Sequence, residues 1–207
     1  METENRKRLF EDMGNKVGKH NLKNAWWLSM GYEVARVPLP VGDYIMENEK
    51  VADVVARKTK RGLELKKMDF LGTYDIAVDS KAGIGEIESN LMNTKNHERV
   101  RDEMILAQNN NIKLYFVVEN RGGYLNSKKT IWNKDILSIK DLFTWKNPRA
   151  FIFRHGKQLY PNCATGSQLA KTCMTMEYKY GCKFVFCLPE DSARIITEIL
   201  EGRYEQG

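Results

Sequence analysis

The sequence predicts an α/β domain in which a mixed central sheet is flanked by helices. Short runs rich in β-branched and aromatic residues alternate with stretches whose apolar residues recur at helical spacing. The 207 residues are enough to bury a real core and suit one domain. Acidic residues stand on two of the predicted strands. We therefore expect a single domain over residues 1–207 with a polar site on those strands.

The first helix is predicted over residues 20–30, after a polar start, and ends near Gly31. Paired aromatics on a helix build core more often than they stack on bases, so Trp26 and Trp27 are expected to pack inside. The apolar face of this helix is expected to comprise Leu22, Ala25, Trp26 and Leu28.

Two short strands and an irregular segment should follow. Residues 32–37 alternate like a strand, which Pro38 and Pro40 end, and residues 42–45 begin another extended piece. The stretch 47–72 is charged and poorly periodic, so we expect a long loop or an inserted hairpin there.

The rest of the chain alternates strands and helices. A β-branched run over 74–78 predicts a strand that ends at Asp79, and 114–119 is the clearest buried strand. Residues 120–149 are punctuated by Gly and Asn. Helices are predicted after Lys81 (apolar positions Ile84, Ile87 and Leu91), over 97–108 (Val100, Met104 and Ala107 inward), over 167–180 and over 189–200, with a strand over 183–187.

Composition excludes several classes of protein. No apolar stretch approaches a membrane span, and the N-terminus lacks the apolar segment of a secretory signal, so a cytoplasmic protein is expected. The four cysteines match no zinc pattern and are expected to be free thiols. No P-loop or GxGxxG fingerprint predicts a nucleotide cofactor. The 33 basic and 27 acidic residues give a net charge of +6, which permits binding to a polyanion without requiring it.

The candidate chemistry lies in two short runs. Asp43 follows Gly42 in Val-Gly-Asp-Tyr, and Asp79 precedes Lys81 in Val-Asp-Ser-Lys. Two carboxylates can hold Mg²⁺ or Mn²⁺, and Lys81 projects from the same strand face as Asp79. The plainer alternatives are a turn residue for Asp43 and a surface ion pair for Asp79 and Lys81. Glu64-Leu65-Lys66 has the same acid-x-Lys pattern but lies in a charged segment that suits solvent.

These runs resemble the XPF-type nuclease domain of the PD-(D/E)XK superfamily. The resemblance rests on Leu-Pro-Val-Gly-Asp-Tyr over 39–44, on Val-Asp-Ser-Lys over 78–81 and on Phe-Val-Val-Glu over 116–119, in that order. The family's Asp-x-Arg-(Glu/Gln) motif stands before its first helix. Asp12 matches its first position, whereas Gly14 and Asn15 replace its arginine and acid. The family's usual Glu-Arg-Lys is Asp79-Ser80-Lys81 in this chain.

The resemblance implies a restriction-endonuclease-like fold and a Mg²⁺-dependent DNA endonuclease, with selectivity for branched or junction DNA. No helix-hairpin-helix tail is evident after Leu200, so it implies a stand-alone domain of the bacterial or phage kind, acting in the host cytoplasm if phage-encoded. XPF-like domains commonly pair, so a homodimer is expected. The implied metal ligands are Asp12, Asp43, Asp79 and Glu86, and Lys81 would position water or phosphate.

Basic residues are the candidates for contacts with DNA. Arg99 and Arg101 suit contacts with the phosphate backbone, although a solvated helix face with a pair from Arg99 to Glu103 is the plainer reading. Residues Lys58, Lys60 and Arg61 could track a DNA strand or merely solubilise a loop. Two other functions stay open: a catalytically silent family member that binds DNA or a nuclease partner, and a protein-interaction module whose charge is incidental.

Overall fold

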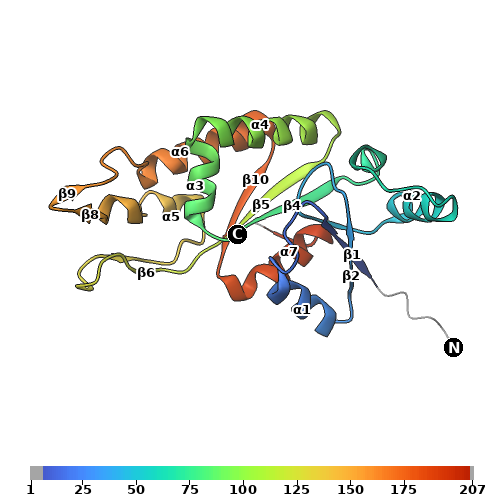
Figure 1. Cartoon of the computed structure of the whole chain (residues 1–207), viewed down its shortest axis with the longest axis horizontal. Coiled ribbons are helices and arrows are strands. Elements are labelled where there is room, and N and C mark those ends of the chain that lie inside the picture. The colour runs from blue at the N-terminus through green and yellow to red at the C-terminus, as the bar shows by residue number, and fades with distance from the viewer. Residues whose placement is uncertain (1–6, 206–207) are drawn as a thin grey trace.

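The computed structural model describes residues 7–205 and is built around a six-stranded mixed sheet (Figure 1). Strands β4, β5 and β10 are parallel to one another, β3 runs antiparallel to β4 and to β1, and β1 is parallel to β2. The spatial order is β10 (Lys183–Cys187), β5 (Lys113–Glu119), β4 (Ile76–Lys81), β3 (Tyr44–Met46), β1 (Arg8–Asp12) and β2 (Glu33–Val37). The predicted fold class, a mixed central sheet flanked by helices, is confirmed.

Helices cover both faces of the sheet, and neighbouring residues of β5 show why. Phe116 and Val118 pack on the side of α3, α4 and α6, whereas Tyr115 and Val117 pack on the side of α1 and α7. Figure 1 shows these two helix layers above and below the strands. The helices are α1 (Asn21–Ser29), α2 (Glu49–Lys60), α3 (Ile84–Met92), α4 (Thr94–Asn109), α5 (Ile139–Leu142), α6 (Gly166–Tyr180) and α7 (Ser192–Leu200), with 3-10 turns at Lys67–Phe70, Pro148–Phe151 and Pro189–Asp191.

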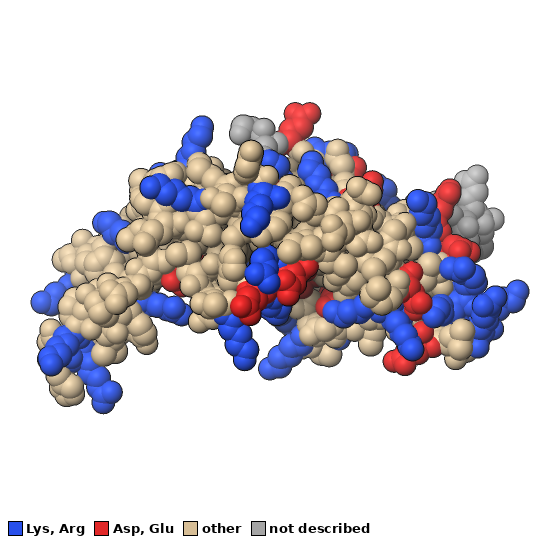
Figure 2. Space-filling view, turned by 90° about the horizontal axis from the view of Figure 1, so that it is seen from above, with Lys and Arg blue, Asp and Glu red and all other residues tan. Residues whose placement is uncertain are grey.

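Between β5 and α6, the chain leaves the sheet and forms two small hairpins. The first pairs β6 (Gly123–Tyr124) with β7 (Trp132–Asn133), and the second pairs β8 (Phe153–Arg154) with β9 (Lys157–Gln158). Both lie at the end of the molecule shown on the left of Figure 1. Lys and Arg side chains predominate at that end in the space-filling view (Figure 2).

Strand β1 corrects the expectation of a merely polar start. Arg8–Asp12 pairs with β2 and β3 inside the sheet. Leu9 and Phe10 are both buried, one on each face of the sheet. A strand that is buried on both faces does not show the alternation of apolar and polar residues that marks a half-buried strand. Two apolar residues between charged neighbours are also too short a pattern to predict β1.

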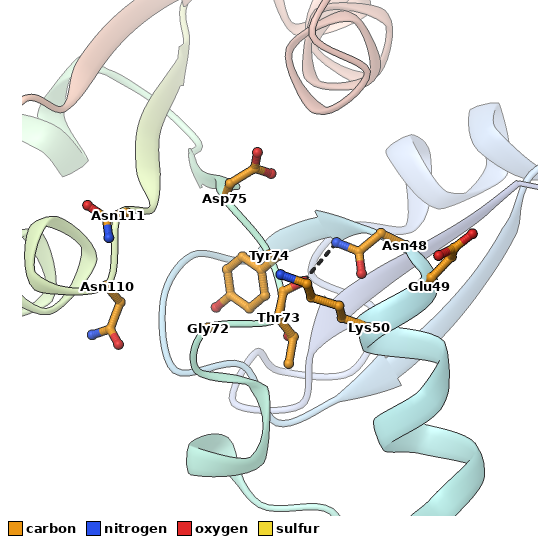
Figure 3. Close-up of a pocket in the computed structure, with 9 residues that line it drawn as sticks. All are labelled: Asn48, Glu49, Lys50, Gly72, Thr73, Tyr74, Asp75, Asn110 and Asn111. Atoms are coloured by element: carbon orange, nitrogen blue, oxygen red, sulfur yellow. Dashed lines mark hydrogen bonds between the residues drawn. The ribbon is translucent and has the colours of Figure 1, made fainter.

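Helix α2 corrects the loop or inserted hairpin expected over 47–72. The Asn48 side chain accepts a hydrogen bond from Val51 N (2.9 Å) and donates one to Thr73 O (2.8 Å), as the dashed line in Figure 3 shows. Val51 and Val54 are buried, at the i and i+3 spacing of a helix. The N-cap and this narrow apolar stripe stabilise a helix whose other residues are mostly charged.

The face of α1 also differs from the expectation. Leu22 is 90% exposed and Leu28 is also exposed, so the helix contacts the core by one edge only. Trp27 lies on that edge, fully buried, and its indole N–H donates to Thr197 Oγ1 of α7 (2.8 Å). The expected core position is confirmed for Trp27, while Trp26 is half-buried against the same cluster.

The remaining predicted elements agree with the structure to within a few residues. Strand β4 continues through Asp79 to Lys81, and Val100, Met104 and Ala107 of α4 are buried as expected. All four cysteines are free thiols. Within residues 7–205, no helix combines the length and apolar character that crossing a bilayer would take.

Candidate active site at the end of β4

Asp79 and Lys81 project from the same face of β4 into the interior. They are two residues apart on the strand, and they are only 4% and 5% exposed. The Lys81 ammonium lies 2.7 Å from each carboxylate oxygen of Asp79 and hydrogen-bonds to Oδ2. It also lies 5.9 Å from the centre of the Phe116 ring on the neighbouring strand. The surface ion pair considered above is therefore wrong, because this pair is buried.

Asp43 is brought against β4 by the turn before β3. Gly42 has a φ of +78°, and a Cβ placed there would come within 2.9 Å of the Ala77 Cβ, so the close approach requires glycine. The Asp43 N–H then donates to Val78 O (2.7 Å). Its carboxylate accepts hydrogen bonds from Ser80 N (2.9 Å) and from the Asn15 amide (2.8 Å).

Asn15 is a site residue that the sequence analysis did not identify. It stands where the resemblance expects an acid or glutamine, and it had been noted only as a departure from that pattern. In the structure its amide nitrogen donates to Asp43 Oδ1, and its own oxygen accepts from Lys19 (3.4 Å). This chain therefore has a neutral donor at a position where the resembling motif has an acid or glutamine.

Glu103 of α4 is a second residue that had been missed. It had been considered only as an intrahelical partner of Arg99, but its Oε1 accepts a hydrogen bond from Gly42 N (2.9 Å). Burial and the negative charge of Asp79 raise the pKa of Glu103. Gly42 and Glu103 are 61 residues apart in the sequence, so no local pattern indicates the contact.

Burial dominates the electrostatics of the site. It raises the pKa of Asp79 to about 6, an effect that Lys81 opposes and Asp43 reinforces. Burial lowers the pKa of Lys81, but the negative charges of Asp79, Asp43 and Glu86 outweigh it, and the net shift is upward. The site therefore holds a charged ammonium among more carboxylates than it can neutralise.

Two further predicted ligands, Asp12 and Glu86, are engaged with the backbone. Asp12 Oδ1 accepts from Leu39 N (2.9 Å), and Oδ2 lies 3.9 Å from the Lys67 ammonium. Glu86 Oε2 accepts from Ala82 N (2.9 Å) at the start of α3. Asp12 thereby fixes the loop that carries Asp43, and Glu86 fixes the turn after Lys81.

All four predicted metal ligands and Lys81 line one cleft of about 560 Å³. Glu103 lines it as well, as do three basic residues that suit phosphate: Lys19, Lys67 and Arg99. Of the predicted DNA contacts, only Arg99 borders this cleft. Arg101 pairs with Asp102 (3.0 Å) and Lys58 with Asp69 (2.9 Å), while Lys60 and Arg61 lie at the end of α2.

The donor set suits a hard cation in part. Within residues 7–205, no group of three or more His, Cys, Asp or Glu side chains is gathered closely enough to enclose a metal ion. Asp79 Oδ1, however, is buried and makes no hydrogen bond among the described residues, although the Lys81 ammonium lies 2.7 Å from it, and the Asp43 carboxylate lies beside it. Mg²⁺ commonly takes one or two carboxylates and completes its shell with water and phosphate oxygens, so these two residues fit that ion.

A second pocket, of about 580 Å³, lies at the other end of β4 (Figure 3). It is lined by Tyr74, Asp75, Asn48 and Glu49, among others. The close-up shows the Asp75 and Glu49 carboxylates apart, with Asn48 between them. This pocket therefore lacks the converging acids of the cleft around Asp79.

No protein-family model and no curated protein matches this sequence. Among solved structures, the chain is similar to "XPF from Aeropyrum pernix, complex with DNA", with 13% sequence identity and a TM-score of 0.47. The similarity covers 95% of this chain and 64% of that one, so this chain spans less than two thirds of its length.

Proposed function

We propose that this protein is a Mg²⁺-dependent nuclease that hydrolyses phosphodiester bonds in DNA. The observation that carries the proposal is the buried Asp79 and Lys81 pair beside Asp43, on the floor of a cleft that basic residues border. The sequence resemblance described above predicts the same activity from the same residues.

Asp43 and Asp79 would hold the cation, and Mn²⁺ could replace Mg²⁺ there. When bound, the cation would neutralise charge on the phosphate and lower the pKa of a water molecule. Lys81, whose ammonium stays charged, would donate a hydrogen bond to the phosphate or to the attacking water. The fixed hydrogen bonds from Ser80 and Asn15 would hold the Asp43 carboxylate in one orientation during the reaction.

The charge balance of the cleft supports a cation. Burial raises the pKa of both Asp79 and Glu103 although Lys81 opposes both shifts, so the positive charge already present does not fully offset the burial of these carboxyl groups. A divalent ion beside Asp79 Oδ1 would favour the ionised forms of both. Arg99, Lys19 and Lys67 border the same cleft and suit contacts with the phosphates on either side of the scissile bond.

The finer features rest on the resemblance alone. They are selectivity for branched or junction DNA, a homodimer, and a stand-alone domain of the bacterial or phage kind. Arg101, Lys58, Lys60 and Arg61 stay proposed as contacts with DNA beyond the cleft. A specific observation favours a second candidate, a silent DNA-binding protein: Lys81 already lies against both oxygens of Asp79 and could take the place of a cation there.

Cleavage of labelled linear, flap and four-way-junction DNA, with Mg²⁺, Mn²⁺ or a chelator, tests the proposal. We expect cutting that requires the cation, and the rates on the three DNAs would rank the substrates. Salt-sensitive binding of all three DNAs without any cutting would instead favour the silent protein, because phosphate contacts release counterions. If the protein neither binds nor cuts these DNAs, the protein-interaction module is the remaining candidate.

A further inference from the structure

The segment 120–165 concentrates the positive charge of this protein. It contains nine Lys or Arg and two Asp, a net charge of +7, whereas the whole chain, with 33 basic and 27 acidic residues, carries only +6. The remainder of the chain is therefore almost balanced. Figure 2 shows Lys and Arg side chains projecting at the end of the molecule that carries this segment. Such a concentration on one projecting segment is typical of a surface that meets a polyanion.

The β6–β7 hairpin in this segment also exposes two aromatic rings. Tyr124 and Trp132 face each other across the strands, with ring centroids 4.7 Å apart and planes at 74°. They are 54% and 51% exposed, so neither contributes to the core. Aromatic faces that stay in water beside positive charge suit stacking with nucleic-acid bases.

The tip of the hairpin places further charge beside these rings. Asn126 holds the tip by accepting from Thr130 N (3.0 Å) and Ile131 N (3.2 Å). Lys128 and Lys129 lie on this tip, and no ion pair among residues 7–205 includes either of them. Both ammonium groups are therefore available to phosphates.

The hollow beside this hairpin and the cleft at Asp79 are lined by adjacent residues of the segment 81–86. A hollow of about 390 Å³ is lined by residues 82–85 on one side and by Tyr124 and Lys134 of the hairpin segment on the other. Lys81 and Glu86, the residues on either side of 82–85, line the cleft at Asp79. A DNA strand with a phosphate at Lys81 could therefore continue past residues 82–85 toward the hairpin.

We propose that the β6–β7 hairpin is a second nucleic-acid site, which stacks the unpaired bases of a DNA strand on Tyr124 and Trp132 and holds its phosphates with Lys128 and Lys129. A base can stack only when its face is free, so this site takes single-stranded DNA and not the interior of a duplex. The proposal rests on the proposed function for the identity of the ligand as DNA. It does not depend on hydrolysis.

Fluorescence anisotropy of a labelled oligothymidine strand and of a blunt duplex, in a chelator so that nothing is cut, tests this site. Trp132→Ala and Tyr124→Ala should each weaken binding of the single strand by at least about fivefold and leave duplex binding nearly unchanged. Trp132→Phe should retain most of the affinity, because it keeps an aromatic face. Lys128→Ala/Lys129→Ala should weaken single-strand binding and lower its dependence on salt.

Matched controls lie on the helices. Tyr178→Ala removes an almost fully exposed tyrosine on α6, and Lys50→Ala/Lys171→Ala removes two exposed lysines on α2 and α6. Single-strand affinities of the hairpin variants equal to those of these controls would overturn the proposal, as would equal losses for the single strand and the duplex. A protein that never cuts DNA but shows the predicted losses would refute the proposed hydrolysis and leave this site standing.

Discussion

The ammonium of Lys81 and the carboxylate of Asp79 form a buried ion pair with both oxygens 2.7 Å from the nitrogen. Breaking such a pair by removing one partner leaves an uncompensated charge in the interior. Lys81→Met should therefore lower the free energy of unfolding at pH 8 by about 3 kcal/mol, measured by urea denaturation.

The loss of unfolding free energy caused by Lys81→Met should become smaller as the pH falls. Without the ammonium, the pKa of Asp79 would rise further, so the carboxyl group becomes neutral at mildly acidic pH and its burial no longer opposes folding. The double variant Asp79→Asn/Lys81→Met should recover most of the stability at pH 8. Unchanged stability of Lys81→Met at pH 8 would show that the pair contributes little.

His20 predicts a second pH effect, on stability. It is buried, and burial together with the positive charges of Lys23 and Lys19 lowers its pKa to about 4, although Glu11 opposes the shift. His20 binds a proton near pH 6.5 in the unfolded chain and near pH 4 in the folded chain. The free energy of unfolding should therefore fall as the pH drops through that interval. The expected loss is on the order of 3 kcal/mol.

The contribution of His20 is isolated by comparison with His20→Gln. Asp79 titrates in the same interval with the opposite effect on stability, so the difference between the two unfolding curves, and not the raw curve, is the relevant quantity. The free energy of unfolding of the intact protein, relative to that of His20→Gln, should fall steadily from pH 7 to pH 4. Parallel curves across the interval would contradict the lowered pKa of His20.

Gly42 should be far less tolerant of substitution than Gly72, although both have a positive φ. An alanine Cβ at Gly42 would lie 2.9 Å from Ala77 Cβ and 3.1 Å from Val78 O, whereas nothing lies within 4 Å of the same position at Gly72. Thermal and urea unfolding should give a loss of about 1 kcal/mol for Gly72→Ala and about 2–4 kcal/mol for Gly42→Ala. Similar losses for the two would mean that Gly42 is not packed against β4 as described.

Glu103 is expected to strengthen cation binding through its charge. Glu103→Gln keeps an oxygen that can accept from Gly42 N but removes the negative charge near Asp79. Calorimetric titration should show Mg²⁺ affinity reduced by about tenfold, with little change in stability. The same substitution at Glu98, an acid elsewhere on α4, is the control and should not change the affinity. Equal Mg²⁺ affinities for both variants would show that Glu103 does not contribute to cation binding.

The sequence predicted best where the pattern was local. The buried run of β5 and the inward positions of α4 follow directly from apolar periodicity. Two acid-bearing runs on the predicted strands also located Asp43, Asp79 and Lys81, which the structure brings into one cleft. Their catalytic roles stay a prediction.

What could not be predicted depends on contacts between distant segments. Glu103 reaches Gly42 only because α4 packs over the sheet, and β1 is a strand because two neighbours pair with it. Helix α2 was missed since its stability comes from one cap and a stripe of two buried valines within a charged sequence. Tertiary context decides such cases over local propensity.

The most direct measurement is the single-turnover rate of DNA cleavage with Mg²⁺ for the intact protein, Asp79→Asn and Asp75→Asn. Asp75 is an exposed acid just before β4 and lines the pocket of Figure 3, so its variant is a matched control for loss of one charge. The account predicts that Asp79→Asn, compared under conditions in which urea unfolding shows it to be folded, lowers the rate by at least about a hundredfold and keeps DNA binding, and that Asp75→Asn cuts normally. Cleavage by Asp79→Asn at the rate of the intact protein would contradict the assignment of this cleft as the active site.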